Sequence, residues 1–486
     1  MKEACGVFGV YAPGKGVAQL TFDGMYALQH RGQESAGMAV SDGEAITVVK
    51  DMGLVTTVFD ERTIACLPGD LAMGHTRYST TGASEWRNAQ PVYRSVGGSG
   101  FALGHNGNLT NTAALAEKAG MFPGVVASDS DFVAELLAAE FPAPVEGTTP
   151  PSTPDGALEA ALRTVLPLLE GAFSFVLLDA THVMGVRDAH GFRPLCLGRL
   201  GPADRPEGWV LASETPALDI VGATFVREIE PGELVIIDES GVRCEQAIPT
   251  DLTDPHLCIF EFVYFARPDS HLYGKEVHAA RRRMGERLAA QAPVEADLVM
   301  GVPESGVPAA EGFARATGIP HGQALVKNRY IGRTFITPGQ GAREESVRRK
   351  LNPLRENIAG KRIVVVDDTI VRGTTQRAVA RMLREAGARE VHLRISCPPV
   401  IWPCFYGIDI PRRDELIAAN STIAELEEYL GVDSLAYLSL DNLVAAIGAP
   451  GAGFCSACLT GNYPAPVPVT LGTTSERPRH AAPAPA

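Results

Sequence analysis

Long apolar runs and an excess of positive charge are both missing from this sequence. No stretch approaches about 18 uninterrupted apolar residues, and the first residues, MKEACGVFGVYAP, contain no basic leader followed by an apolar segment. Acidic residues outnumber basic ones by 57 to 43, which gives a net charge of −14 at pH 7. Nucleic acid and anionic membrane attract positive surfaces, so we expect binding to neither. The sequence instead predicts a soluble, cytoplasmic protein.

Cysteines are few and unevenly spaced, and no repeat with a period of about 20 to 50 residues is visible. The cysteine spacing excludes a small disulfide-rich secreted domain, and the lack of repeats excludes a solenoid or propeller. In a reducing compartment we expect the cysteines to be thiols, metal ligands or catalysts. The nine cysteines stand at positions 5, 66, 196, 244, 258, 397, 404, 455 and 458.

The length and composition predict two large domains. A chain of 486 residues with 45% apolar residues exceeds what one hydrophobic core usually organises. Residues 245–257, EQAIPTDLTDPHL, are polar and punctuated by proline, which is typical of a domain junction. Residues 141–156 crowd Pro, Gly and Thr between two helical patterns and predict a surface loop within the first domain.

The two halves of the chain differ in their secondary-structure pattern. Short β-type runs in the first half, such as GVFGVYA, SFVLLDA and ELVIID, alternate with a few amphipathic helical segments and predict stacked sheets flanked by helices. From residue 275 onward, apolar strand candidates such as ADLVMGV, RIVVVDD and VHLRIS alternate with helical segments such as TTQRAVARMLREAG. This alternation predicts a parallel sheet with helices on both faces.

The most specific motif in the chain is RIVVVDDTIVRGTT, residues 362–375. An apolar strand ends there in two acids and continues into a Gly/Thr loop that opens a helix, which is where ligands of open α/β sheets bind. The loop can enclose a phosphate at the helix N-terminus, and the two acids can accept hydrogen bonds from ribose hydroxyls. Helix capping and turn chemistry would explain either half alone, whereas the whole string favours a ribose phosphate site. The candidate residues are Asp367, Asp368, Thr369, Arg372, Gly373, Thr374 and Thr375.

This string resembles the PRPP-binding signature of type I phosphoribosyltransferases. The resemblance implies a phosphate loop, ribose-binding acids and Mg²⁺. A second strand end, VMGVPESGVPAAEGFA at residues 299–314, fits a pyrophosphate-facing loop in which Ser305 contacts the metal together with Asp367 and Asp368. Magnesium prefers such oxygen ligands and would bridge the diphosphate. An ordinary strand-to-helix turn is the alternative for residues 299–314.

A basic segment, residues 326–353, lies between these two elements. It contains glycine and few large aliphatic residues, which predicts a mobile lid whose positive charge meets a triply anionic substrate and whose closure excludes water. Solvated surface charge is the alternative. The basic residues are Lys327, Arg329, Arg333, Arg348, Arg349 and Lys350, of which Lys327 and Arg329 are the candidates for PRPP binding.

A set of motifs in the first part of the chain stands in a characteristic order: Cys5 in MKEACGVFG, LQHRGQESAG (28–37), GHTRYSTTG (74–82), GHNGNLTN (104–111) and SDSD (128–131). Alone, each has an ordinary interpretation as a buried cysteine, a turn or a helix cap. In this order they resemble the glutamine amidotransferases built on an N-terminal-nucleophile hydrolase fold. The resemblance implies that residues 1–4 are a propeptide whose removal frees the α-amine of Cys5 to act as the base for its thiol.

The same resemblance assigns roles to residues within these motifs. Arg77 would hold the α-carboxylate of glutamine, and Asp129 would pair with its α-ammonium group. The side-chain amide of Asn106 and the backbone N–H of Gly107 would form an oxyanion hole, which is worth about 3–4 kcal/mol of barrier per donor in other acyl-transfer enzymes. Arg31 belongs to a loop that helps to shape the same glutamine pocket.

Glutaminase motifs followed by a PRPP signature resemble the glutamine phosphoribosylpyrophosphate amidotransferase family, over residues 5 to about 464. The segments GVRDAHGFRPL (185–195), SETPALD (213–219) and FVYFARPDS (262–270) add to this resemblance, the last near the domain interface. The family makes 5-phosphoribosylamine from glutamine and PRPP in the first committed step of purine synthesis. The resemblance therefore implies these two substrates, an internal path for ammonia, feedback inhibition by purine nucleotides and a homotetramer.

The resemblance also implies the domain organisation and the fold class, which combines α/β and α+β architecture. After the propeptide, residues 5–245 would form the glutaminase domain as an N-terminal-nucleophile hydrolase αββα sandwich. Residues 258–464 would form a type I phosphoribosyltransferase domain with a parallel sheet. The last residues, 465–486, are rich in proline and alanine towards their end and predict a disordered tail.

Four cysteines are candidate metal ligands: Cys258, Cys404, Cys455 and Cys458. Their positions resemble those that hold a [4Fe–4S] cluster in one branch of the family, where its role would be structural because the amination needs no electron transfer. Tetrahedral zinc would accept the same four sulfurs and is the alternative. We expect the cysteines at 66, 196, 244 and 397 to be core residues.

Two other functions compete with this interpretation. A hexosamine-forming amidotransferase would share the glutaminase half but carry sugar-isomerase repeats in place of VVVDDTIVRGTT. A non-catalytic PRPP-sensing regulator would carry a basic nucleic-acid-binding element and would need no Cys5, whereas this chain is acidic and begins with a complete set of glutaminase motifs.

Overall fold

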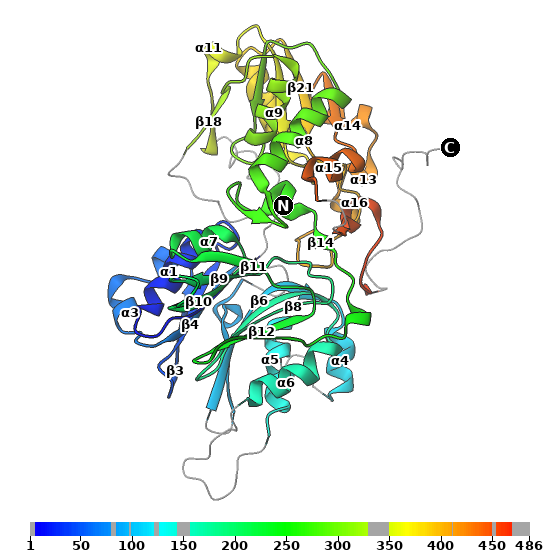
Figure 1. The fold of residues 1–486 in the computed structure, drawn as a ribbon. Helices are drawn as coiled ribbons and strands as arrows, with labels where there is room; N and C mark the ends of the chain where they lie inside the picture. The colour runs from blue at the N-terminus through cyan, green and yellow to red at the C-terminus, as the bar shows by residue number, and fades with distance from the viewer. Residues whose placement is uncertain are drawn as a thin grey trace, which may run out of the picture.

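The computed structural model describes residues 5–78, 84–96, 99–120, 126–142, 156–328, 349–410, 412–449 and 453–468. The chain forms two domains, the first coloured blue to green and the second green to red in Figure 1. Within the described ranges, no helix combines the length and the apolar character that a membrane span needs. The predicted propeptide, most of the predicted loop at 141–156 and residues 469–486 of the predicted tail lie outside the described residues.

The first domain contains two antiparallel sheets. One sheet has seven strands in the order β11 (Thr224–Glu228), β9 (Cys196–Leu200), β10 (Gly208–Ala212), β1 (Gly6–Tyr11), β4 (Leu71–Arg77), β2 (Ser35–Ser41) and β3 (Ile46–Met52). The other has six strands in the order β13 (Gly241–Gln246), β12 (Glu233–Asp238), β8 (Val183–Arg187), β7 (Gly171–Leu178), β6 (Ser99–Leu109) and β5 (Val92–Val96).

The two sheets pack face to face, and helices cover their outer faces (Figure 1). Central strands are buried on both faces, as all eight residues of β7 are, which explains why SFVLLDA reads as an apolar run without alternation. The predicted αββα sandwich is therefore confirmed. The helices are α1 (Val17–Ala27), α2 (Val55–Val58), α3 (Glu61–Ala65) and α7 (Thr215–Ile220) beside the first sheet, and α4 (Thr112–Lys118), α5 (Asp129–Ala139) and α6 (Ala157–Val165) beside the second.

The second domain is built on a four-stranded parallel sheet, as predicted from the alternation of strands and helices. Its strand order is β17 (Leu298–Gly301), β20 (Arg362–Asp367), β21 (Glu390–Ile395) and β22 (Ser434–Tyr437). The larger helices are α8 (Val277–Gln291), α9 (Val307–Thr317), α12 (Thr374–Glu385), α14 (Ile423–Leu430) and α15 (Leu440–Ile447). Shorter elements are β15 (His271–Leu272), β16 (Lys275–Glu276), β18 (Leu325–Lys327), β19 (Leu351–Pro353), α11 (Arg355–Ile358), α13 (Ile417–Asn420) and α16 (Ala457–Thr460).

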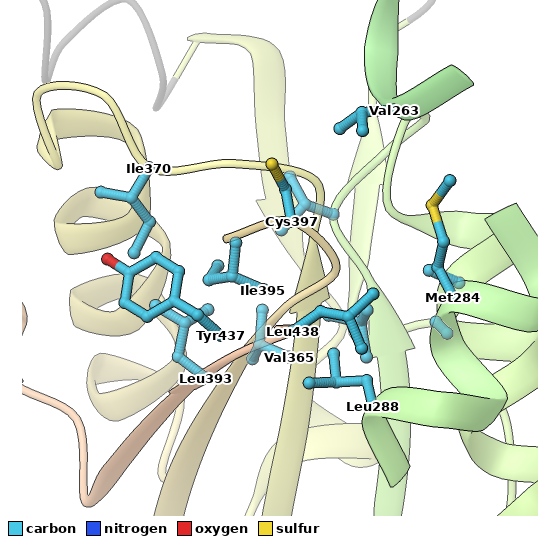
Figure 2. Packing of buried hydrophobic residues seen from close by; sticks show 14 of the residues in the cluster. Val263, Met284, Leu288, Val365, Ile370, Leu393, Ile395, Cys397, Tyr437 and Leu438 are labelled. Carbon is cyan, nitrogen blue, oxygen red and sulfur yellow. The ribbon is translucent and has the colours of Figure 1, made fainter. Parts of the chain in front are cut away.

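Buried apolar side chains join this sheet to its helices. Figure 2 shows Met284 and Leu288 of α8 on one side of the strands, and Ile370 with Leu393 and Ile395 of β21 toward the other helical layer. Because β20 and β21 lie in the middle of the sheet, their apolar residues are covered on both faces. The sheet is thus a rigid support for the loops at its strand ends.

The two domains meet along the segment that the sequence predicts to be the junction. Backbone N–H groups of Asp254, His256 and Cys258 donate to carbonyls of residues 189, 190 and 192 in the first domain. The strand β14 (Leu257–Cys258) then pairs in parallel with β23 (Phe454–Cys455). A π-helix, η4 (Glu261–Phe265), follows and leads into the second domain.

The packed chain also runs further than the sequence predicts. Ala465, the first residue of the predicted tail, is buried, and its carbonyl accepts a hydrogen bond from the Tyr406 hydroxyl at 2.5 Å. The start of the tail at 465 was therefore wrong, because this alanine packs in the small apolar cluster between the domains together with Phe192 and Phe405.

Candidate functional site

Cys5 directly precedes β1, and β1 pairs with β4. Gly6 is opposite Thr76 in this antiparallel pair, so Cys5 lies beside the end of β4 at Arg77. The Cys5 thiol donates a hydrogen bond to the carbonyl of Tyr78 at 3.4 Å. The thiol is buried at 7% exposure, so the small space around it is shielded from solvent.

The electrostatic surroundings keep the Cys5 thiol protonated. Burial raises the pKa of Cys5, and Asp129 and Glu34 add to this, while Arg77 acts in the opposite direction. A nucleophilic role therefore requires a base. His75 is in the adjacent motif, but burial lowers its pKa to about 3 and its ring Nε2 contacts the carbonyl of His105 at 2.9 Å.

Asn106 and Gly107 lie near the end of β6, which the contact between His75 and the His105 carbonyl brings next to β4. The Asn106 side chain is completely buried, and both its amide nitrogen and its amide oxygen have no hydrogen-bond partner among the described residues. Leaving such an amide unpaired costs about 1–3 kcal/mol per group. We interpret this amide as one that is kept ready for a ligand.

Gly107 has a backbone conformation that only glycine adopts readily. Its φ is +152°, and a Cβ at this position would lie 2.0 Å from the carbonyl oxygen of Ala172. The glycine therefore allows β6 to continue beside β7 while its backbone lies next to the Asn106 amide.

Asp129 is the first residue of α5, directly after the N-cap Ser128. Its carboxylate accepts hydrogen bonds from the backbone N–H of Leu109 at 3.2 Å and of Ser130 at 2.8 Å. Burial opposes ionisation, but His105 and these N–H groups hold the pKa of Asp129 below its ordinary value. A fixed negative charge therefore lies beside the end of β6 and close enough to Cys5 to affect its pKa.

Arg77 ends β4 with 3% of its surface exposed, and its guanidinium lies 4.0 Å from the Glu34 carboxylate. The elements β1, β4, β6 and α5 thus bring together Cys5, Asn106, Gly107 and Asp129 around this arginine. The site thus combines a guanidinium, a carboxylate, an unpaired amide and a thiol. Such a set of groups can bind an α-amino acid and attack the amide of its side chain.

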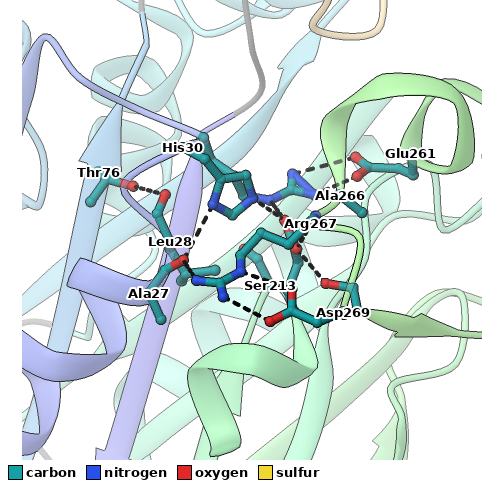
Figure 3. A network of polar contacts seen from close by, with 12 residues as sticks. Ala27, Leu28, His30, Thr76, Ser213, Glu261, Ala266, Arg267 and Asp269 are labelled. Atoms are coloured by element: carbon teal, nitrogen blue, oxygen red, sulfur yellow. Dashed lines mark hydrogen bonds and ion pairs between the residues drawn. The ribbon is translucent and has the colours of Figure 1, made fainter. Parts of the chain in front are cut away.

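The side chain of Arg31 is turned toward the second domain. Its guanidinium is fully buried, with Nε donating to Glu214 at 2.5 Å and Nη2 paired with Glu261 of the second domain. These donors are committed to carboxylates of the protein, so a contribution of Arg31 to the glutamine pocket would come through its loop and stays a prediction. Figure 3 shows this network between the segment that carries Ala27 and His30 and the segment that carries Glu261 and Arg267.

In the second domain, Asp367 ends β20 and Asp368 follows it, at the carboxyl edge of the parallel sheet. Gln376 Nε2 donates to Asp367 at 2.8 Å, and the hydroxyls of Ser305 and Thr369 donate to Asp368 at 2.6 Å and 2.9 Å. Burial and the neighbouring charge of Asp368 raise the pKa of Asp367 well above its ordinary value. A bound cation would relieve this repulsion.

The loop after these acids opens helix α12 with the geometry of a phosphate site. Gly373 is the N-cap with φ +72°, and Thr374 and Thr375 form the first turn of the helix. The side chain of Arg372 forms an ion pair with Glu415, with Nε to carboxylate oxygen at 2.7 Å. Arg372 therefore offers its backbone N–H, rather than its guanidinium, to a phosphate.

The predicted lid is described only at its two ends. Lys327 ends β18, and its ammonium lies 3.7 Å from Glu304, in the loop that also carries Ser305. Residues 329–348, including Arg329, Arg333 and Arg348, lie outside the described residues. Ser305 therefore contacts one of the two acids, and Lys327 lies beside the loop that carries Ser305.

Four thiols from separate segments lie close together at the domain interface. Cys258 is opposite Cys455 in the β14–β23 pair, and the carbonyl of Cys458 accepts from the N–H groups of residues 401 and 402, just before Cys404. Burial raises the pKa of all four thiols, and the neighbouring sulfurs raise that of Cys458 further. No three of these sulfurs lie within 4.8 Å of one another in the described chain.

Sequence reasoning missed the buried charges between the domains. Glu214, Glu261 and Arg193 each have a side chain with at most 1% exposure. Arg193 and Glu214 lie in segments that were noted only for their resemblance, and Glu261 directly precedes a third such segment, residues 262–270. A charged residue within an apolar stretch, such as Glu261 in CIFEFVYF, was the signal that could have found them.

Another group that the sequence did not reveal is His190, Asp254 and His256. Among the described residues it is the one group of three or more His, Cys, Asp or Glu side chains whose donor atoms lie within 4.8 Å. The Nδ1 atoms of both imidazoles contact the carbonyl of Asp254, at 2.8 and 2.9 Å. These hydrogen bonds give both imidazole rings a structural role at the domain junction.

Comparison with known proteins agrees with the two sites. A family model for the glutamine amidotransferase domain matches residues 75–219, and one for the phosphoribosyl transferase domain matches residues 274–398. The amidophosphoribosyltransferase of Mycobacterium tuberculosis (strain ATCC 25618 / H37Rv) is 54% identical over 481 residues, covering 96% of this chain and 87% of the relative. That of Bacillus subtilis (strain 168) is 43% identical over 471 residues, covering 96% and 94%.

A solved structure is similar over nearly the whole chain. The glutamine phosphoribosylpyrophosphate amidotransferase from B. subtilis, complexed with ADP and GMP, matches with a TM-score of 0.84 and 42% sequence identity. The match covers 96% of this chain and 99% of that chain. The similarity therefore includes both domains and their arrangement.

Proposed function

Because the chain belongs to the amidophosphoribosyltransferase family, which performs the first step of purine biosynthesis, we propose specific roles for the residues of its two sites. Cys5 is the nucleophile that attacks the side-chain amide of glutamine. Ammonia released there passes through the interior to the second domain, where it replaces the pyrophosphate of PRPP. Water then hydrolyses the thioester on Cys5, so that glutamine, water and PRPP give glutamate, pyrophosphate and 5-phosphoribosylamine.

In the glutaminase half, Arg77 binds the α-carboxylate of glutamine and Asp129 binds its α-ammonium group. The freed α-amine of Cys5 takes the thiol proton and returns it to the leaving ammonia. The raised pKa of the buried thiol supports the need for such a base. The Asn106 amide and the Gly107 N–H donate to the oxyanion of the tetrahedral intermediate.

In the transferase half, Asp367 and Asp368 accept hydrogen bonds from the ribose hydroxyls of PRPP. The N–H groups and hydroxyls from Thr369 to Thr375 hold the 5-phosphate at the N-terminus of α12, where the helix dipole favours an anion. Oxygens of Ser305 and the two acids would hold Mg²⁺, which would supply positive charge to the diphosphate. The hydroxyl of Ser305 at 2.6 Å from Asp368 supports this set of ligands. Lys327 adds positive charge at the edge of the site, as Arg329 would in the lid.

One observation carries the assignment of the glutaminase site: the buried Asn106 amide without a partner among the described residues. A structural asparagine at this depth would use its donors and acceptor within the protein. A buried amide without a partner, next in sequence to Gly107, fits the stabilisation of a developing oxyanion.

Replacement of Asn106 by alanine tests this assignment. We expect glutamine-dependent synthesis to fall by about 10²–10³-fold in kcat, because one oxyanion donor is lost. Ammonia-dependent synthesis should stay near the wild-type rate, since it bypasses the glutaminase. Both rates are measured by coupled assay of phosphoribosylamine. An equal loss of both rates would contradict the assignment.

The cysteine cluster fits a [4Fe–4S] group better than zinc. Tetrahedral zinc with bonds of about 2.3 Å would hold its sulfur ligands about 3.8 Å apart. The wider spacing of these sulfurs among the described residues supports a larger group. We therefore propose that Cys258, Cys404, Cys455 and Cys458 hold a [4Fe–4S] cluster with a structural role, as in the iron–sulfur branch of the family.

Metal analysis separates the two alternatives. Anaerobically purified protein should contain about four iron and four acid-labile sulfide per chain and little zinc. Cys455→Ser should lose the iron and melt at a lower temperature, because a buried ligand set is left unfilled. Cys66 and Cys244 are exposed, so the expectation that they are core residues was wrong, and Cys66→Ser should retain the iron. One zinc per chain without sulfide would overturn the cluster.

Regulation and assembly remain parts of the same proposal. A relative of 42% identity is complexed with ADP and GMP, which supports purine nucleotides as feedback inhibitors of this chain. The homotetramer and the cytoplasmic location implied by the family are carried with it as predictions.

A further inference from the structure

A single carboxylate of the second domain, Glu261, lies between two arginines of the first. Its side chain has 0% exposure. Arg31 contacts both its oxygens, at 3.4 Å to Oε1 and more closely to Oε2, and Arg193 Nη1 donates to Oε1 at 3.3 Å. Figure 3 shows Glu261 extending from its short helix toward the segment that carries His30. Glu261 thus joins two segments of the glutaminase domain that are far apart in sequence.

These charges balance one another within the interface. Arg31 also pairs with Glu214, so two buried guanidinium groups face two buried carboxylates. Burial works to lower the pKa of Arg31, but Glu261 and Glu214 together raise it above its ordinary value. Removing one carboxylate leaves a buried cation without compensation, and the segments that carry the arginines must then move.

Arg31 supports the wall of the glutamine pocket that carries Arg77, the proposed ligand of the α-carboxylate. Gly32, next to Arg31, packs so closely on β4 that a Cβ would lie 2.4 Å from the Thr76 carbonyl oxygen and 2.6 Å from the Arg77 nitrogen. The loop of Arg31 therefore lies in direct contact with the backbone at Thr76 and Arg77, and a shift of this loop changes the support of Arg77.

Arg193 supports the oxyanion wall, which is the part of the pocket formed by Asn106 and Gly107. Arg193 Nη2 donates to the carbonyl of Tyr406 at 2.7 Å. The next residue, Gly407, has φ +101° and packs against Gly107, where a Cβ would lie 3.1 Å from the Gly107 carbonyl carbon. Asn108, on the other side of Gly107, donates to the carbonyl of Phe405 at 2.9 Å. A loop of the transferase domain thus packs against the part of β6 that carries Gly107, and Arg193 holds this loop in place.

From these contacts we propose that Glu261 is a positioning residue of the glutaminase site, supplied by the transferase domain. It fixes the α-carboxylate wall through Arg31 and the oxyanion wall through Arg193. The glutamine pocket is complete only when the two domains are docked. The inference rests on the proposed roles of Arg77 and Gly107, and it adds a residue that touches neither substrate.

The experiment compares Glu261→Gln with wild type in the full-length holoenzyme. The amide keeps the size of the side chain but removes the charge that balances both arginines. We expect kcat/KM for glutamine to fall by about 10- to 100-fold, because a displacement of about 1 Å in a positioned site has an effect of this size. Ammonia-dependent synthesis should remain within about twofold of wild type, and iron content should be unchanged.

Glu233→Gln is the matched control. Glu233 is also a buried carboxylate paired with an arginine, Arg227, with oxygens at 2.5 and 2.7 Å, but it lies on β12 away from the glutamine pocket. This variant should keep both activities. It shows whether the loss of any buried ion pair weakens the glutaminase.

The contact of Glu261 with Arg31 and its contact with Arg193 make separate predictions. Arg31→Lys should mainly raise KM for glutamine, because it loosens the wall of Arg77. Arg193→Lys should mainly lower kcat, because lysine cannot contact both Glu261 and the Tyr406 carbonyl, and the oxyanion wall then loses its support. These milder variants keep the inference testable if Glu261→Gln does not fold.

Parallel losses of glutamine- and ammonia-dependent activity in Glu261→Gln would mean that the carboxylate only stabilises the fold, and would overturn the inference. Unchanged kinetics would overturn it as well. Failure of the underlying site would look different, because Cys5→Ala would then still release glutamate. A chain in which Cys5→Ala is inactive and Glu261→Gln behaves as wild type refutes only the role of Glu261.

Discussion

Replacing Cys5 by alanine should abolish glutamine-dependent synthesis of 5-phosphoribosylamine and leave ammonia-dependent synthesis close to the wild-type rate. The thiol is a nucleophile that can form a covalent bond to the glutamine carbonyl carbon. Loss of a nucleophile removes a reaction step rather than a contact, so we expect a fall of at least about 10³-fold. Glutamate release and phosphoribosylamine formation, measured with glutamine and then with ammonium chloride, give the two rates.

Cys196→Ala is the matched control for this result. Cys196 is also a buried thiol of the same sheet, on β9, where it donates to the carbonyl of Ala212 at 3.3 Å. It should keep both activities. Glutamate release by Cys5→Ala would refute the central assignment. The intact mass of the wild type should also lack residues 1–4, since the proposed base is the α-amine of Cys5.

Much of the fold could be predicted because it is encoded in local patterns. The apolar run GVFGVYA became β1, and the amphipathic TTQRAVARMLREAG became α12 with Gly373 as its cap. The two acids at the end of β20 were placed correctly because a strand, a loop and a helix follow one another directly in sequence. Such features depend on hydrophobic period and turn chemistry over about 15 residues.

The interface could not be predicted, because it depends on partners that lie far apart in sequence. Arg31 and Glu261 are separated by 230 residues, and nothing in LQHRGQ indicates that the arginine turns toward the second domain. A charged residue within a motif indicates which interactions it can form, but it does not show which residue it pairs with.

The transferase site makes the second large prediction. Asp367 and Asp368 lie side by side with at most 7% exposure, and burial together with the charge of Asp368 raises the pKa of Asp367. Two carboxylates in such a place are unfavourable for folding alone. Their arrangement, with Ser305 on Asp368 and Gln376 on Asp367, is instead suited to a cation and to ribose hydroxyls.

The variant Asp367→Ala/Asp368→Ala should therefore lose amination with both glutamine and ammonia as nitrogen donors, by about 10²–10³-fold or more, because it removes charge that binds the reacting sugar. This loss of both rates distinguishes it from Cys5→Ala. It should also fold, since a repulsive pair is removed, and its apo form should melt no lower than wild type. Asp297→Asn is the control: Asp297 pairs with Arg362 at the opposite end of β20 and should keep both rates. Ammonia-dependent activity that survives in the double variant would place PRPP binding elsewhere in the domain.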